Sequence, residues 1–401
     1  MRLPVLFIVI TVMLDAIGIG LIMPVMPALI LEVQGGSLAS AALWGGVLST
    51  VFAVMQFLFS PLLGGLSDRY GRRPVLLLSL VVMVLDYILM AVASTMWLLV
   101  VGRIIGGITA ATHGTASAYM ADISKPGEKA ANFGLIGAGF GVGFVLGPLV
   151  GGLLGEYGTR APFYAAALLA ALNAGFGWLI LRETLTEANR RPFHWTRANP
   201  LGAFVSVARL PGIGRLLAVY FIYSVAFYVY PAVWSFFTQA RFGWTPQTIG
   251  VSLALFGITM AIVQGWLIRY ILRWLGEWRT VVYGLVFDTF AFGLIAAVTH
   301  GTVALLLTPI AALGAVITPA LQGIMSQAVP DDAQGELQGV LTSAAALSMI
   351  VSPLMMTSVF AVFTREEAPI HFAGAPFLVS LVLMVLALVI FLRSRTTSGP
   401  S

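Results

Sequence analysis

Apolar residues run along the chain in blocks of helix length, separated by short segments that carry glycine, proline or charge. One helical crossing of a bilayer needs about 20 consecutive apolar residues. The pattern predicts an all-α polytopic membrane protein. The twelve predicted spans cover residues 4–31, 41–63, 75–94, 97–120, 128–154, 161–181, 213–237, 246–272, 279–299, 302–325, 334–362 and 373–392.

Composition excludes a soluble domain. Of the 401 residues, 59% are hydrophobic and 9% are charged, whereas a soluble domain carries about 25% charged residues. The net charge of +5 does not indicate nucleic-acid binding, because the basic residues lie where a membrane protein places them. The absence of cysteine excludes a disulfide framework. The first span lacks a small-residue cleavage site, so we expect it to be retained.

Lysine and arginine fall mainly on one side of the predicted spans. That side holds 17 of the 21 basic residues and both termini, and the exceptions are Arg103, Arg160, Arg241 and Arg365. The positive-inside rule makes this side cytoplasmic. Two cytoplasmic termini require an even number of spans, which agrees with twelve.

The longest polar stretch, RETLTEANRRPFHWTRANP, divides the chain into two halves of six spans. GGLSDRYGRRPVLL follows the second span, and IRYILRWLGEWRTVV follows the eighth, 205 residues later by its glycine. Two related halves are typical of secondary transporters. We expect six-helix bundles at 1–182 and 211–395, a cytoplasmic central loop at 183–210 and a disordered tail at 396–401.

Four ionisable residues lie well inside the spans: Asp15, Asp86, Arg103 and Asp288. A charge at that depth costs about 2.5–3.5 kcal/mol on insertion scales. One arginine cannot neutralise three carboxylates, and desolvation favours the neutral form of an unpaired one. Such groups suit a proton-coupled transporter. For any single aspartate, a purely structural pair with Arg103 remains an alternative.

Several motifs resemble one known family. GGLSDRYGRRP resembles the cytoplasmic-loop signature of the major facilitator superfamily, G-x-x-x-D-R-x-G-R-R, and GAGFGVGFVLGPLVGG resembles the fifth-span motif of its drug/proton antiporters. LDAIGIGLIMPVMP, GRIIGGIT, AYMADI and PALQGIMSQAV are similar to the bacterial tetracycline/proton antiporters. The resemblance implies the major facilitator fold, with two pseudo-symmetric six-helix bundles in the bacterial inner membrane.

The resemblance also implies export of tetracycline-like drugs as a metal chelate, in exchange for protons, by alternating access. Mg²⁺ would travel with the drug, so we expect no cofactor and no metal site on the protein itself. We expect the chain to function as a monomer whose partners are the drug, protons and lipid.

The fourth span departs from the family sequence at Ala110, His113 and Thr115, which leaves a broader multidrug/proton antiporter as an alternative. An uptake symporter is disfavoured by the fifth-span motif. An enzyme is not expected, because the four histidines are scattered without metal-ligand spacing. A channel would not need a carboxylate in each half.

Each buried charge has an expected role, partly implied by the resemblance. Asp288 is the leading proton carrier, since the interior of its span holds no basic residue. Asp86 lies on a proton or substrate pathway, and Arg103 is a fixed positive charge paired with Asp15 or Asp86. For Asp15, a transport role and the support of a glycine- and proline-rich helix are equally open.

Candidate substrate contacts each have a structural alternative. Gln56 and Gln264 lie mid-span, one per half, and would bind a polar drug or join two helices. Tyr223, Phe227, Tyr230 and Trp234 share one side of the seventh span, as a planar-drug surface or an interfacial belt. His113 is either a substrate contact or a satisfied hydrogen-bonding group.

Two motifs are candidates for moving parts. The predicted cytoplasmic gate comprises Gly64, Asp68, Arg69, Gly71, Arg72 and Arg73, with Asp122 as the partner of Arg72 and the eleventh helix facing Asp68. Its arginines would set orientation in any case. In the fifth span, small residues recur every four positions beside Pro148, which predicts a smooth face for tight packing or sliding. They are Gly139, Gly143, Gly147, Gly151 and Gly155, with Gly152 adjacent.

Overall fold

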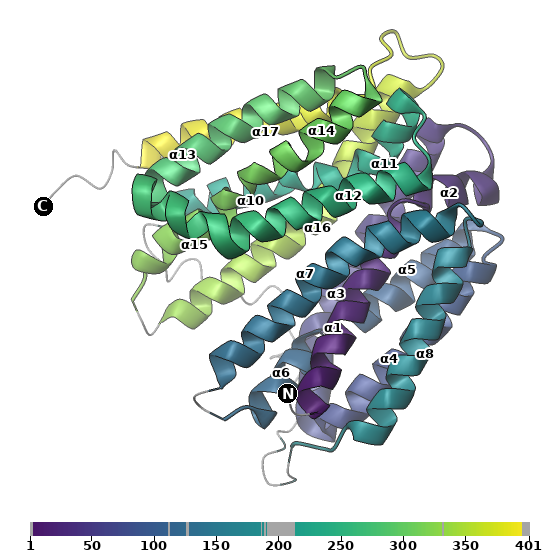
Figure 1. Cartoon of the computed structure of the whole chain (residues 1–401), viewed down its shortest axis with the longest axis vertical. Coiled ribbons are helices and arrows are strands. Elements are labelled where there is room, and N and C mark those ends of the chain that lie inside the picture. The colour runs from purple at the N-terminus through teal and green to yellow at the C-terminus, as the bar shows by residue number, and fades with distance from the viewer. Residues whose placement is uncertain are drawn as a thin grey trace, which may run out of the picture. The chain divides into compact units, whose positions relative to one another are not determined.

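The structure is a computed structural model, and it describes residues 3–110, 113–125, 128–185, 187, 190, 213–330 and 333–394. Every regular element in those ranges is a helix (Figure 1). Most of the predicted central loop, 183–210, and all of the predicted tail, 396–401, lie outside the described residues.

The helices of the amino-terminal half follow one another with short connections. They are α1 (Leu3–Ile22), α2 (Met26–Gln34), α3 (Leu38–Tyr70), α4 (Arg72–Val92), α5 (Met96–Ala110), α6 (His113–Ile123), α7 (Lys129–Gly155) and α8 (Ala161–Ile180). The predicted first span is two helices. Pro24 and Pro27 lie at the break, where proline cannot donate the hydrogen bond that would continue α1.

The carboxy-terminal half contains two irregular segments within its helices. Its elements are α10 (Gly214–Phe227), α11 (Val229–Phe242), α12 (Pro246–Ile262), the π-helical η3 (Val263–Leu267), α13 (Ile268–Ala297), α14 (Gly301–Ala311), the 3₁₀-helical η4 (Ala312–Val316), α15 (Ile317–Gln327), α16 (Gln334–Thr364) and α17 (Ala375–Ser394). Each irregular segment lies inside a predicted span, the eighth for η3 and the tenth for η4.

Eleven helical stretches of the described chain are long and apolar enough to cross a membrane. One of them, Pro246–Ala297, has 52 residues and contains both the predicted eighth and ninth spans. Gly276 separates these two spans with φ 70° and ψ 167°, a conformation that glycine adopts readily and other residues do not. The prediction of an all-α polytopic membrane protein is confirmed.

The helices form two compact units, described here separately. Unit 1 comprises Met1–Gly35, Val51–Pro200 and Thr245–Ala254, and unit 2 comprises Gly36–Thr50, Leu201–Trp244 and Leu255–Ser401. The main boundary between them, after Pro200, falls within the predicted central loop, but each unit also includes one segment from the other half of the chain. The first part of α3 packs in unit 2, and the first part of α12 packs in unit 1.

In unit 1, α1 runs along α7 and α4 runs along α8 (Figure 1). Buried apolar residues of α1, α4 and α6, such as Phe7, Leu80 and Tyr119, form one cluster. The Asn173 amide of α8 donates to the Thr11 hydroxyl of α1 over 3.0 Å. Polar bonds of this kind join helices where lipid provides no hydrophobic driving force.

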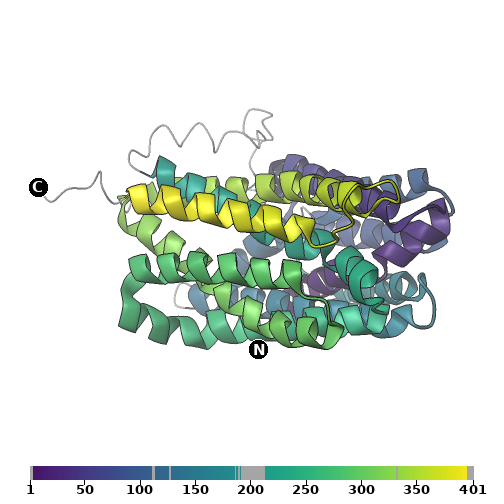
Figure 2. The same cartoon turned by 90° about the horizontal axis from the view of Figure 1, so that it is seen from above.

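In unit 2, α17 packs against α13 and α10, and Figure 2 shows α17, in yellow, as an uninterrupted helix. Small hydroxyl side chains attach neighbouring helices to the backbone of α10. Ser352 of α16 donates to the Val225 carbonyl over 2.7 Å, and Ser380 of α17 donates to the Ala226 carbonyl over 3.0 Å. Thr50 at the end of the α3 segment donates to the Ile350 carbonyl over 3.1 Å.

Candidate functional site

Asp86 is buried on α4 with 2% of its surface exposed. Its carboxylate lies against the glycines of α5. A Cβ at Gly102 would be 3.1 Å from Oδ1, and one at Gly106 would be 2.7 Å from Oδ2. Oδ1 has no hydrogen-bond partner in the described structure. The small residues of α5 therefore make room for a carboxylate that the neighbouring side chains leave unsatisfied.

Arg103 forms no ion pair with Asp86 or Asp15 within the described residues, contrary to the expected pairing. Its guanidinium lies over the Phe52 ring, 5.5 Å from the ring centre, and Nε has no hydrogen-bond partner there. The charge still acts on Asp86 electrostatically. A cation over an aromatic face is attracted by the ring quadrupole, so Phe52 takes the place of a carboxylate.

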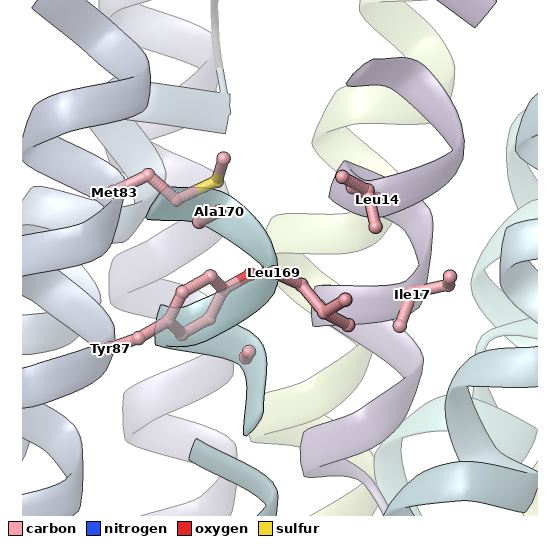
Figure 3. Close-up of a pocket in the computed structure, with 8 residues that line it drawn as sticks. Leu14, Ile17, Met83, Tyr87, Leu169 and Ala170 are labelled. Carbon is pink, nitrogen blue, oxygen red and sulfur yellow. The ribbon is translucent and has the colours of Figure 1, made fainter. Parts of the chain in front are cut away.

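A small cavity lies between α1, α4 and α8 (Figure 3). Its volume of about 10 Å³ is near the lower limit for one water molecule. Figure 3 shows the Tyr87 ring extending from α4 toward Leu169 of α8. The Tyr87 hydroxyl lies directly against Gly18. Sequence reasoning did not select Tyr87, although it follows Asp86 in the chain.

Asp288 is buried on α13 with 3% of its surface exposed. Its carboxylate lies against Gly314 of η4, and Oδ2 has no hydrogen-bond partner among the described residues. No described cation forms an ion pair with it. Tyr223 and Tyr230 are the ionisable groups that interact with it electrostatically. Unit 2 thus holds a buried carboxyl group with no ion-pair partner among its described residues.

The two glutamines differ in their surroundings. Gln56 is half-buried and makes no hydrogen bond to the described residues. Gln264, in the π-helical segment, is exposed and donates to the Ala315 carbonyl over 3.5 Å. At Gln264, this contact supports the alternative that the glutamine joins two helical segments. Drug binding by either glutamine stays a prediction.

The seventh-span aromatics lie within unit 2. Tyr223 stacks on Phe227 at 5.7 Å between ring centres, and Tyr230 and Trp234 pack around Phe377 at 6.0 and 6.1 Å. Trp234 is 1% exposed. This packing makes Tyr230 and Trp234 part of an aromatic core, and their contact with a drug remains a prediction.

His113 is exposed at the start of α6 and meets Phe140 of α7 edge-on at 6.2 Å between ring centres. Phe140 stacks in turn on Phe144 at 6.3 Å. Sequence reasoning missed these two phenylalanines, because they lie inside the glycine motif. Together with His113 they form one ring cluster in unit 1.

The predicted pairing of Arg72 with Asp122 is present, with Nε 3.4 Å from Oδ2. Arg72 also pairs with Asp68 at 2.6 Å and donates to the Ser67 hydroxyl at 2.6 Å. Arg69 lies over Tyr70, and Gly64 has no atom near the place of a Cβ. The motif is therefore organised around Arg72, and its part in gating remains a prediction.

Glu183, just after α8, caps the amino end of α4. The backbone amides of Arg72 and Arg73 donate to its carboxylate over 2.9 and 3.1 Å. Gly71 has φ 106°, and a Cβ there would strike this carboxylate. A negative group at a helix amino end meets unpaired N–H groups and the positive end of the helix dipole. The glycine of the motif thus allows Glu183 to approach.

Replacing Glu183 with alanine is expected to destabilise the protein by about 1 kcal/mol, the usual cost of losing an N-terminal cap. The reason is that two α4 amides lose their acceptor. The measurement is the thermal unfolding midpoint of the protein purified in detergent. Glu187→Ala is the control, because it removes the same charge from a side chain that makes no hydrogen bond to the described residues. Equal midpoints for the two variants would contradict the cap.

The glycine face of α7 packs on α1 in matched steps. A Cβ at Gly143, Gly147 or Gly151 would meet a carbonyl oxygen of α1, and the carbonyls are those of Met13, Ile17 and Leu21. Both series advance by four residues, so each turn of α7 lies on one turn of α1. Gly139 continues the face against Val9, with 3.0 Å from a Cβ to the carbonyl oxygen.

The opposite side of the same α7 end packs on the start of α12. A Cβ at Gly152 would be 2.5 Å from the Pro246 carbonyl oxygen. Pro148 supplies a carbonyl that approaches Gly250 closely. Small residues on both faces let α7 lie between two backbones. These contacts support the prediction that the glycine face packs tightly. Sliding along that face stays a prediction.

No group of three or more His, Asp or Glu side chains in the described residues could hold a metal ion. The expectation of no protein-borne metal site rests on the sequence argument and stays a prediction.

Comparison with known proteins identifies the family. Residues 8–353 match the model of the Major Facilitator Superfamily. The chain is 42% identical to the class C tetracycline resistance protein of Escherichia coli over 88% of each chain. It is 40% identical to the class H tetracycline resistance protein of Pasteurella multocida, over 89% of this chain and 88% of the relative.

A solved structure shows the same fold. The human organic anion transporter MFSD10 is 27% identical, with a TM-score of 0.69 over 97% of this chain and 99% of its own. The family match, the helices and the relatives agree, and they identify the chain as a multi-pass membrane transporter of the Major Facilitator Superfamily.

Proposed function

We propose that the chain is a proton-coupled antiporter that exports tetracycline-like drugs from the cytoplasm. The drug class is carried over from relatives named as tetracycline resistance proteins. The observation that carries proton coupling is Asp288, 3% exposed and without a cation among the described residues. A carboxyl group in that setting is stable when protonated and costly when charged.

Each unit contributes one buried carboxyl group. Asp288 serves as the proton carrier in unit 2, and Asp86 with Arg103 serves in unit 1. Because Phe52 rather than an aspartate faces Arg103, the cation is free to respond when Asp86 changes charge. The drug travels as a Mg²⁺ chelate, with the ion as cargo. The transporter opens in turn to each side of the membrane, and it takes up a proton when it releases the drug.

The remaining parts have supporting contacts. The pairing of Arg72 with Asp68 and Asp122 supports a gate at the cytoplasmic end of α3. The basic bias of the loops supports cytoplasmic termini in a bacterial inner membrane. We propose that one chain suffices for transport.

A broader multidrug antiporter is the second candidate. His113 replaces a glycine of the family sequence, is exposed and lies edge-on to Phe140. Such a ring cluster would accept flat hydrophobic drugs of several kinds.

The test is tetracycline accumulation in inverted membrane vesicles with Mg²⁺, with and without a proton gradient. Accumulation that depends on the gradient is expected. If folded protein accumulates no tetracycline but does accumulate other planar drugs, the multidrug candidate replaces the first. Gradient-independent, downhill flux would contradict antiport by either.

A further inference from the structure

Two irregular helical segments meet in unit 2 beside Asp288. The π-helical η3 and the 3₁₀-helical η4 are in contact, and the Gln264 amide of η3 donates to the Ala315 carbonyl of η4 over 3.5 Å. A π-bulge is common at functional sites, and a 3₁₀ stretch inside a helix often marks a hinge. The contact between two irregular segments therefore suggests that this part of unit 2 has a functional role.

Asp288 lies directly on the irregular backbone of η4. A Cβ added to Gly314 would overlap the Asp288 carboxyl group, with Oδ1, Cγ and Oδ2 as its nearest atoms. Only glycine at this position leaves room for the carboxyl group against the main chain. Asp288 is buried, and Oδ2 has no partner among the described residues.

Few other groups near Asp288 are charged or titratable. Tyr223 of α10 and Tyr230 of α11 interact with it electrostatically. Tyr223 also hydrogen-bonds Thr318, in the first turn of α15. The packed segments η3, η4, α14 and α15 contain no Asp, Glu, His, Lys, Arg or Tyr, and α17, which also packs on α13, contains only Arg393, in its last turn. Besides these tyrosines, the η4 backbone at Gly314 is in close contact with the carboxyl group and can respond to its charge.

The two protonation states of a carboxyl group require different hydrogen-bond partners from that backbone. A protonated carboxyl donates one hydrogen bond, whereas a carboxylate only accepts. A 3₁₀ turn and an α turn use different backbone partners, so a change between them alters which N–H and C=O groups are free. Protonation of Asp288 and the local form of η4 should therefore depend on each other.

Resting on the proposed function, we propose that Gly314 and the paired segments η3 and η4 position Asp288, so that its proton uptake is coupled to a backbone change in the tenth span. Gly314 is a positioning residue and touches neither proton nor drug. Gln264 holds η3 to η4 through its bond to Ala315. Without this contact, Asp288 would only bind and release a proton. With it, the protonation state of Asp288 can change the backbone conformation of η4.

The first test is Gly314→Ala, with Gly293→Ala as its control. A Cβ at Gly293, on the same helix as Asp288, would meet only the Leu381 side-chain end at 3.2 Å. In inverted vesicles with tetracycline and Mg²⁺, Gly314→Ala should lower gradient-driven accumulation about tenfold, a typical scale for disturbed coupling. It should also shift the pH profile of uptake, while the control keeps both. An unchanged pH profile would overturn the proposal.

The second test does not depend on transport. Thermal midpoints are measured in detergent for the unmodified chain, Gly314→Ala, Asp288→Ala and the double variant. If the added methyl group acts through the carboxyl group, Gly314→Ala loses stability and the double variant recovers it. An equal loss in both backgrounds would overturn the contact. Should the wild-type chain fail to accumulate tetracycline, the proposed function fails, and this second test still decides the role of Gly314.

Discussion

Replacing Asp288 with asparagine is expected to abolish the uphill accumulation of tetracycline, with a fall on the order of a hundredfold, the lower end of the effect of removing a proton-transferring group. Asparagine has nearly the same shape and cannot release or bind a proton in this range. The carboxyl group is buried without a cation among the described residues, so no neighbour is positioned to replace it. The measurement is uptake into inverted vesicles under an imposed proton gradient.

Folding provides the control for this variant. Asparagine removes a costly charge and leaves no cation unpaired, so the thermal midpoint should stay the same or rise. Thr289→Ala is a matched neighbour, because its hydroxyl donates only to the Leu285 carbonyl of its own helix, over 2.7 Å. That variant should transport normally. Gradient-driven accumulation by folded Asp288→Asn would remove Asp288 from the mechanism.

The second large effect is expected at Gly151. Gly151→Ala should destabilise the protein by about 1–3 kcal/mol, the range for overpacking a tight interior. The added Cβ would meet the backbone of Leu21, with its Cα and carbonyl carbon both 2.7 Å away. Backbone cannot move aside as a side chain does, so α1 and α7 must separate. The thermal midpoint in detergent and the yield of folded protein measure the loss.

Gly141, on the same helix, should respond in the opposite direction. No atom lies within 4 Å of the place where a Cβ would be. Alanine there should stabilise the protein by about 0.5–1 kcal/mol through the lower entropy of its unfolded chain. A lower midpoint for Gly141→Ala than for Gly151→Ala would show that helix contact does not decide the glycine pattern.

Sequence patterns predicted the class of fold because lipid imposes a simple rule. A crossing helix must be predominantly apolar over about 20 residues, so its approximate limits can be read from composition. The pairing of Arg72 with Asp122 was also predictable, since complementary charges at one end of neighbouring helices have few other partners there. The connections at Gly71 and Gly276 both carry a glycine with positive φ, which agrees with the match between the two loops in the sequence.

Other features depend on contacts that no local pattern encodes. VQGWL and ALGAV contain nothing that distinguishes π or 3₁₀ geometry from an ordinary apolar helix. Gly314 was missed because its only special property is the carboxyl group opposite. Arg103 forms no ion pair with Asp86 or Asp15 within the described residues. Its guanidinium lies over Phe52 and acts on Asp86 electrostatically, and no sequence pattern indicates that aromatic contact. The membership of residues 36–50 and 245–254 in the unit of the other half was not predictable from polarity, which does not report packing.

The two exchanged segments mean that the six-span halves read from the sequence differ from the compact units of the structure. A gene that ended after the sixth predicted span would encode α3 entire, although residues 36–50 have their packing partners in α16. It would lack residues 245–254, whose glycine and proline backbone lies on α7. Each half-molecule would thus carry a segment that completes the other. The six-span half and the compact unit are therefore different lengths of chain.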